Sequence, residues 1–330
     1  MAIKDWPGGV VSDSPVVPSG NTEVDTASGV WSLAQAADYT KQGIWPTAGV
    51  PGSYAILAGG ISGYSGSVEG VVITTLGNST DFGTLYEGVS NSPAAIGSQA
   101  RYIYAGGYDG AANSNVIQYG SWHSTGTTQD FGDLTFARNS LYGLNNNTRG
   151  IFAGNNNVIE YVTIASTGNA IDFGDMTLSR SSARGVNSPT RGVFMSGSGT
   201  TVMDYITIAS TGNATDFGDV PLATIQAGSC SSSTRGILGG GRTTTSVNTI
   251  EYITIASTGD STDFGDILVA TRYLDAGSSL TRGVFMGSDG GTTIQYITIA
   301  STGNATDFGN LTLARAQVAA ATSNCHGGLS

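Results

Sequence analysis

Apolar residues of this chain come in short runs separated by small and polar residues, not in long amphipathic stretches. In the segment 190–213 a Val-Phe-Met run at 193–195 is followed by a second apolar run at 202–208. Runs of this length bracketed by Gly and Ser indicate short strands. The Ser-Thr-Gly-Asn that comes next tolerates positive φ, so the chain can turn tightly into a third strand that begins Asp-Phe-Gly.

A fourth segment in the same pattern is rich in Ala and Ser, as at residues 315–323. Small residues suit the crowded innermost position of a radially arranged sheet. The local pattern therefore predicts units of four short antiparallel strands, with almost no helix signal.

The unit is repeated six times along the chain. Its clearest marker is Asp-Phe-Gly, whose copies lie 42 to 49 residues apart and begin at Asp81, Asp130, Asp172, Asp216, Asp263 and Asp307. A period of this size with four strands per unit is typical of propeller blades. We therefore predict an all-β fold, a six-bladed β-propeller over residues 51–330, preceded by a separate segment at 1–50.

The units also predict how the ring closes. The first unit begins at Tyr54 without a small-residue strand before it, and the last unit ends with a surplus one at 315–323. We expect this C-terminal strand to become the innermost strand of the first blade, which removes an exposed sheet edge.

The repeat resembles the kelch family. The resemblance rests on a glycine-ended strand, with Gly-Gly at 59–60, 106–107 and 239–240, followed by a strand with a recurrent tyrosine. Phe of each Asp-Phe-Gly stands where kelch repeats carry tryptophan, and the second glycine is replaced at Asn155, Ser198 and Ser288. The resemblance implies a kelch-like propeller and covers the repeats but not residues 1–50.

Composition narrows the classes of partner. The net charge is −11 with 13 basic residues, which argues against nucleic acid or an anionic membrane as a partner. No apolar run approaches the 18 residues of a membrane span, and the N-terminus lacks the apolar core of a secretion signal. We expect synthesis in a cytoplasm, no membrane insertion, and free thiols at Cys230 and Cys325.

We expect the repeated polar residues to have a structural role, because a catalytic site needs different residues that come together at one place in the fold. We interpret the six repeated aspartates as turn caps that accept backbone N–H groups, and the repeated arginines, such as Arg191, as bridges to carbonyls or an aspartate. His123 and His326 have no second metal ligand nearby in the pattern, so we expect no metal and no cofactor. A sialidase Asp-box is only partly matched at 301–308. The sequence thus predicts a protein that is not an enzyme.

The loops that follow the glycine-ended strands vary in length and composition from unit to unit. Variable loops on a rigid scaffold are common binding sites. We predict ligand contacts at Tyr64, Tyr108, Asp109 and Arg242, with ordinary solvated loops as the alternative.

Residues 1–50 carry three tryptophans, Trp6, Trp31 and Trp45. A capping box precedes an apolar face, and we predict one short helix at 33–42 that begins at Leu33. Such a helix is too short to be stable alone. We expect the segment to dock on the propeller or on another subunit, anchored by the three tryptophans and Leu33.

The N-terminal segment contains Ala-Ser-Gly-Val-Trp-Ser-Leu at 27–33 and Gly-Ile-Trp-Pro at 43–46. The units repeat, almost unchanged, the run Tyr-Ile-Thr-Ile-Ala-Ser-Thr-Gly-Asn-Ala-Thr-Asp-Phe-Gly. Together these features resemble propeller proteins of tailed bacteriophages, especially marine and cyanobacterial ones. The resemblance covers essentially the whole chain. It implies a virion structural protein, attached to other virion proteins through residues 1–50 and present in many copies.

Three functions follow as hypotheses. The first is a tail fibre, spike or baseplate appendage that binds a host-surface glycan or protein. The second is a capsid or tail decoration protein that stabilises the particle, and the third is an extracellular carbohydrate-active enzyme.

Overall fold

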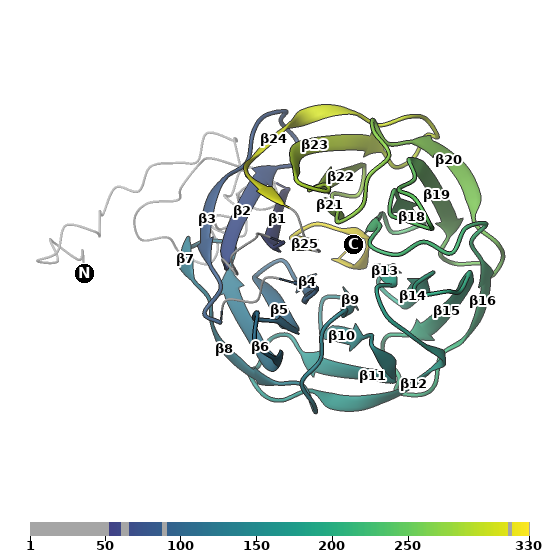
Figure 1. The fold of residues 1–330 in the computed structure, drawn as a ribbon. Coiled ribbons are helices and arrows are strands. Elements are labelled where there is room, and N and C mark those ends of the chain that lie inside the picture. The colour runs from purple at the N-terminus through teal and green to yellow at the C-terminus, as the bar shows by residue number, and fades with distance from the viewer. Residues whose placement is uncertain (1–52, 61–65, 88–90, 316–318, 330) are drawn as a thin grey trace, which may run out of the picture. The chain divides into compact units, whose positions relative to one another are not determined.

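The computed structural model describes residues 53–60, 66–87, 91–315 and 319–329. They form six antiparallel sheets set radially around a central axis (Figure 1), which confirms the predicted six-bladed β-propeller. The described residues are almost entirely β, and their one helical element is the 3-10 turn η1 (Gly327–Leu329). The predicted helix at 33–42 and the predicted anchors Trp6, Trp31, Leu33 and Trp45 lie outside the described residues, as does Tyr64.

Each blade has four strands that succeed one another from the axis outwards. Blade 1 is β25 (Ala319–Ser323), β1 (Tyr54–Gly59), β2 (Ser67–Val72) and β3 (Thr80–Thr84), with the two-residue β7 (Gly126–Thr127) at its edge, and blade 2 is β4 (Ala94–Gly97), β5 (Arg101–Tyr108), β6 (Asn113–Ser121) and β8 (Gln129–Asp133). Blade 3 is β9 (Tyr142–Asn145), β10 (Arg149–Ala153), β11 (Asn156–Thr163) and β12 (Ile171–Arg180), and blade 4 is β13 (Arg184–Asn187), β14 (Arg191–Met195), β15 (Val202–Thr207) and β16 (Thr215–Asp219). Blade 5 is β17 (Gly228–Ser231), β18 (Arg235–Gly239), β19 (Thr249–Thr254) and β20 (Thr262–Asp266), and blade 6 is β21 (Asp275–Ser278), β22 (Arg282–Met286), β23 (Gly291–Thr298) and β24 (Thr306–Arg315).

The closing strand pairs as the sequence predicts. β25 is antiparallel to β1, with partners from Ala55↔Ser323 to Gly59↔Ala319, and forms the inner strand of blade 1. The predicted boundary differs in one respect, because Arg315 belongs to β24 of blade 6 and not to the closing strand. Its side chain is fully buried. Both ends of the described chain are thus held in one sheet.

The core lies between neighbouring blades. Each of its six apolar clusters combines side chains of two adjacent blades, such as Ile250 and Phe264 of blade 5 with Phe285 and Ile297 of blade 6. In each Asp-Phe-Gly the phenylalanine points into such a cluster and the aspartate points out to solvent, as strand alternation requires. The repeat therefore sets the spacing of the core.

The Asp-Phe-Gly segments also join each blade to the next. In blade 3 the carbonyl of Phe173 accepts from Gly212 N–H of blade 4 at 2.8 Å, and Asp175 N–H donates to Asn213 Oδ1 at 3.0 Å. Equivalent bonds occur at every other junction except that between blades 1 and 2, where β3 pairs with β7 in parallel. The glycine is needed because a Cβ at Gly174 would lie 2.4 Å from the Gly212 oxygen. We call these contacts the outer belt.

Replacing Gly174 by Ala should weaken the outer belt. Gly174 and Gly212 both have positive φ, at 145° and 153°, but a Cβ at Gly212 would meet no atom within 4 Å. G174A should therefore lower the free energy of unfolding by about 1–3 kcal/mol more than G212A, the cost of forcing atoms into occupied space. Thermal or urea denaturation of the two variants measures the difference, and equal losses would mean that backbone strain alone matters.

Candidate binding face

The repeated arginines bridge blades, which confirms their predicted architectural role. The Arg191 guanidinium lies 4.4 Å from the centre of the Tyr205 ring and donates to the carbonyls of Ile255 and Ala256 in the next blade, at 3.1 and 2.9 Å. The same stacking and carbonyl contacts recur at Arg101, Arg149, Arg235 and Arg282. These side chains are committed to the fold and are not available for a ligand.

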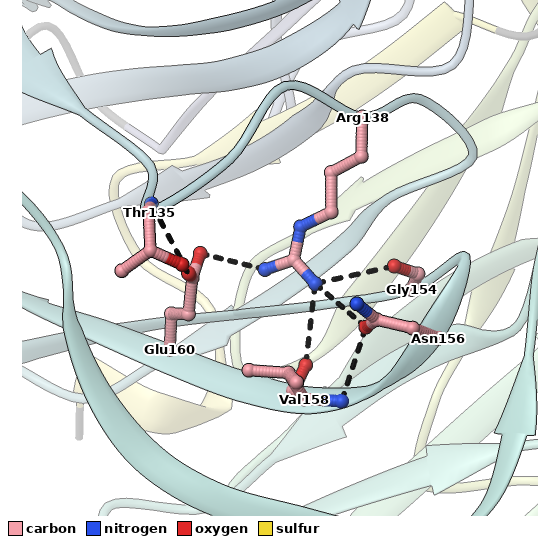
Figure 2. Close-up of polar contacts among 6 residues, drawn as sticks. All are labelled: Thr135, Arg138, Gly154, Asn156, Val158 and Glu160. Carbon is pink, nitrogen blue, oxygen red and sulfur yellow. Dashed lines mark hydrogen bonds and ion pairs between the residues drawn. The ribbon is translucent and has the colours of Figure 1, made fainter.

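A second set of arginines forms buried ion pairs that the sequence reasoning missed. Arg138, in the connection between blades 2 and 3, donates to Glu160 of blade 3 at 2.6 Å and to the carbonyls of Gly154 and Val158 (Figure 2). Arg180 pairs in the same way with Asp204, and Arg315 with Glu69 at 3.0 Å. The sequence did contain a signal for these ion pairs, because the residue before the repeated tyrosine is often acidic.

The central tunnel is closed at one end by the C-terminal segment. There, His326 Nε2 lies 2.8 Å from the Gly97 oxygen, and Gly328 N–H donates to His326 Nδ1 at 3.2 Å. The last residues of the inner strands, including Ser231, Ser278 and Ser323, are joined around the axis by hydrogen bonds. The space left between the inner strands is about 50 Å³. A space of this size has room for a few water molecules but not for a sugar ring.

One ion pair lies at the opposite end of the inner strands. Arg184 begins β13, Asp275 begins β21, and their Nε and Oδ1 atoms are 3.9 Å apart, with β17 of blade 5 between them. Burial raises the pKa of Asp275, although Arg184 and three backbone N–H groups act against the rise. The pair joins blades 4 and 6 across the inner strand of blade 5.

The buried His326 should make stability depend on pH. Burial lowers the pKa of His326 to about 4 from its ordinary 6.5. Between these values the unfolded chain binds a proton that the folded chain does not. The free energy of unfolding should therefore fall by about 1.4 kcal/mol per pH unit as pH drops from about 6 to 4. His326→Asn should remove this part of the slope in urea denaturation, whereas replacing the exposed His123 by Asn should leave it intact. An unchanged slope in His326→Asn would contradict this assignment.

The variable hairpins and the connections between blades share one side of the propeller, which we call the loop face. It consists of the hairpins between the second and third strands and the connections that lead to the next inner strand. Backbone bonds tie them together, as in Tyr108 N–H to Asn91 O at 2.9 Å and Gly241 N–H to Thr271 O at 2.8 Å.

Two of the predicted binding residues serve their own hairpin. Tyr108 Oη donates to Gly110 O at 3.0 Å, and Asp109 Oδ1 accepts from the N–H groups of Ala111 and Ala112, both at 2.7 Å. These backbone bonds lower the pKa of the Asp109 carboxyl. Its exposed carboxylate therefore stabilises the turn.

The six repeated aspartates are exposed at the outer rim. Asp81 Oδ1 accepts from Gly83 N–H at 3.2 Å, which is a local turn contact. The blades are connected instead by the carbonyl of the phenylalanine next to the aspartate and by the turn of the following blade, as at Gly212 and Asn213. The sequence reasoning did not assign these residues that role.

Departures from the repeat gather on the loop face at blades 5 and 6. Two residues before the inner strand, the backbone of blades 2 to 6 has positive φ. The residue there is a serine at 92, 140 and 182 but Gln226 and Tyr273 in blades 5 and 6. Tyr273, at φ 64°, donates its N–H to Gln226 O at 3.1 Å. Backbone held in this region costs energy, and such outliers occur often at functional sites.

Charged residues lie next to Tyr273 and near Gln226 in the fold. Arg272 lies 4.5 Å from the centre of the Tyr273 ring and contacts Asp289 at 2.9 Å. The backbone of Arg242, the third predicted binding residue, pairs with Ile225 beside Gln226, and its Nε is buried without a partner among the described residues. Gln226, Arg242, Arg272, Tyr273 and Asp289 form what we call the blade 5–6 patch.

The described part of the chain holds no cluster of three His, Cys, Asp or Glu side chains arranged to bind a metal. It also contains no helix long and apolar enough to cross a membrane. No protein-family model matches this chain, and no curated protein is significantly similar to it.

Proposed function

We propose that the protein is a non-enzymatic binding propeller whose loop face contacts its ligand at the blade 5–6 patch. The observation that carries the proposal is the strained Tyr273, which replaces a serine used in three other blades and is flanked by Arg272 and Asp289. A tyrosine ring offers both an apolar face and a hydroxyl, and arginine and aspartate offer directed hydrogen bonds. This combination suits a glycan or a polar protein surface. The narrow tunnel argues against a catalytic pocket at the axis.

The proposal extends to the setting of the protein. We infer a kelch-like virion appendage of a tailed bacteriophage, a tail fibre, spike or baseplate component that engages the host surface and attaches to other virion proteins through residues 1–50. Support comes from the phage-like segments at 27–33 and 43–46 and from the near-identical repeats. Many copies in a particle would compensate for weak single contacts. Imaging of the labelled chain in assembled particles tests this setting, and a chain missing from the particle contradicts it.

Binding of the purified protein to a glycan array and to host cells tests the role of the patch. Tyr273→Asn removes the ring while keeping a residue that tolerates positive φ, so binding should fall at least tenfold without loss of the fold. Tyr86→Asn, at an exposed tyrosine of blade 1, is the control and should bind normally. Absence of any binding would favour a decoration protein, and turnover of a cell-surface polysaccharide would favour the carbohydrate-active enzyme.

A further inference from the structure

At three junctions between blades, the guanidinium of an arginine pairs with a buried acid of the next blade. We call this pair the guanidinium lock, and two other junctions lack its arginine. The locking residue lies eight positions after the repeated aspartate; it is Arg138, Arg180 or Arg315 in the locked junctions, and Thr224 or Thr271 in the other two. Thr224 lies within the connection from blade 4 to blade 5, and Thr271 within the one from blade 5 to blade 6.

The residue opposite the lock distinguishes these two junctions. Opposite Thr271, blade 6 carries the neutral Gln295, whose Oε1 accepts from Leu268 N–H at 2.7 Å. Opposite Thr224, blade 5 carries Glu251, at the position of the acids that pair with arginine elsewhere. The junction between blades 4 and 5 therefore keeps the anion of the lock but not its cation.

Glu251 also lacks a contact from a threonine. In two of the three locked junctions a threonine contacts the acid, as Thr135 N–H donates to Glu160 Oε1 at 3.1 Å and Thr177 Oγ1 to Asp204 Oδ1 at 2.6 Å. The equivalent residue here is Pro221, which has neither a hydroxyl nor an N–H.

The side chains of this junction hold oxygen atoms with few partners. The one hydrogen bond of Glu251 within the described residues comes from Ser261 Oγ at 3.3 Å, and burial raises the pKa of Glu251. Thr224 Oγ1 and Gln226 Oε1 are buried without a partner among the described residues. Glu251 is 9% exposed, against 0–1% for the three paired acids Glu69, Glu160 and Asp204. We call Pro221, Thr224, Gln226 and Glu251 the Glu251 cradle.

We propose that the Glu251 cradle binds a guanidinium group from outside the chain, the side chain of an arginine on a partner protein. The planar fork of a guanidinium matches a carboxylate and adjacent carbonyls, and this chain builds that geometry three times with its own arginines. In those junctions the guanidinium also donates to carbonyls equivalent to Gly240 and Thr249. A single carboxylate balances one positive charge. The exposed Leu222 beside Thr224 marks the entrance on the loop face.

This inference goes beyond the proposed function, since its central residue, Glu251, lies outside the blade 5–6 patch. The two clusters share only Gln226, and the test does not depend on the ligand of the patch. Thr224→Arg supplies the cation internally and should block the cradle. Glu251→Gln keeps the shape and removes the charge. Thr271→Arg, which faces the neutral Gln295, is the matched control for an added arginine.

The test is the melting temperature of the full chain in methylguanidinium chloride against sodium chloride at equal ionic strength. The wild type and Thr271→Arg should show a saturable rise at millimolar concentrations, and Thr224→Arg and Glu251→Gln should show none. Thr224→Arg alone should raise the melting temperature, which shows that it folds. No rise in the wild type, or the same rise in all four proteins, overturns the proposal. Nα-acetylarginine amide should act like methylguanidinium; if only the smaller cation acts, the source in a partner's arginine is overturned.

Discussion

Deletion of residues 319–330 should abolish cooperative unfolding of the propeller. The deletion removes β25, which pairs with β1 along its whole length, and leaves the β1 edge open. It also removes Ser323 from the hydrogen-bonded ring around the axis and His326 from the closed end of the tunnel. The loss should exceed about 5 kcal/mol, comparable to the whole stability of an ordinary domain.

Circular dichroism melts and size-exclusion chromatography measure this effect. A shorter deletion, of residues 327–330, keeps β25 and is the control; it should lower the melting temperature but retain a cooperative transition. An unchanged melting temperature after the long deletion would show that the ring does not need its closing strand.

Breaking one buried ion pair should have the second largest effect. Arg180 and Asp204 are both fully buried, and Arg180 also donates to the carbonyls of Ser196 and Val202. Arg180→Met leaves the Asp204 carboxylate in the interior without its cation, so the free energy of unfolding should fall by about 3–5 kcal/mol. Urea denaturation at pH 7 provides the measurement.

Two further variants make this prediction specific. Arg242→Met, on the loop face, should cost less than about 1 kcal/mol because no partner is left unpaired. The double variant Arg180→Met/Asp204→Leu should recover much of the loss, since an apolar pair of similar volume needs no desolvated charge. A double variant as unstable as Arg180→Met would mean that lost packing, not the unpaired charge, causes the effect.

Local sequence chemistry was sufficient for the fold because every blade repeats it. Turn residues, alternation and the spacing of Asp-Phe-Gly predicted the strands, the six blades and a closing C-terminal strand. That strand was predicted at 315–323 and lies at Ala319–Ser323. The carbonyl contacts of the repeated arginines also followed from the residue type. Their partners lie at the equivalent position of the next unit.

The candidate site was less predictable. Arg242 was chosen from its variable loop and belongs to the blade 5–6 patch, but Gln226 and Tyr273 were not chosen, because nothing in their residue types signals a positive φ. Asp109 was chosen for its charge, and only the hairpin geometry commits that carboxylate to its own turn.

The sequence by itself determined the period of the repeat, the strands and the C-terminal strand that closes the ring. These depend on the pattern of residues within each unit. The tertiary structure alone decided which acid meets which arginine, that Gly174 abuts Gly212, and that His326 closes the tunnel. Those contacts join residues of different blades or of opposite ends of the chain. Their geometry exists only after the ring has closed and has brought the edges of adjacent sheets into contact.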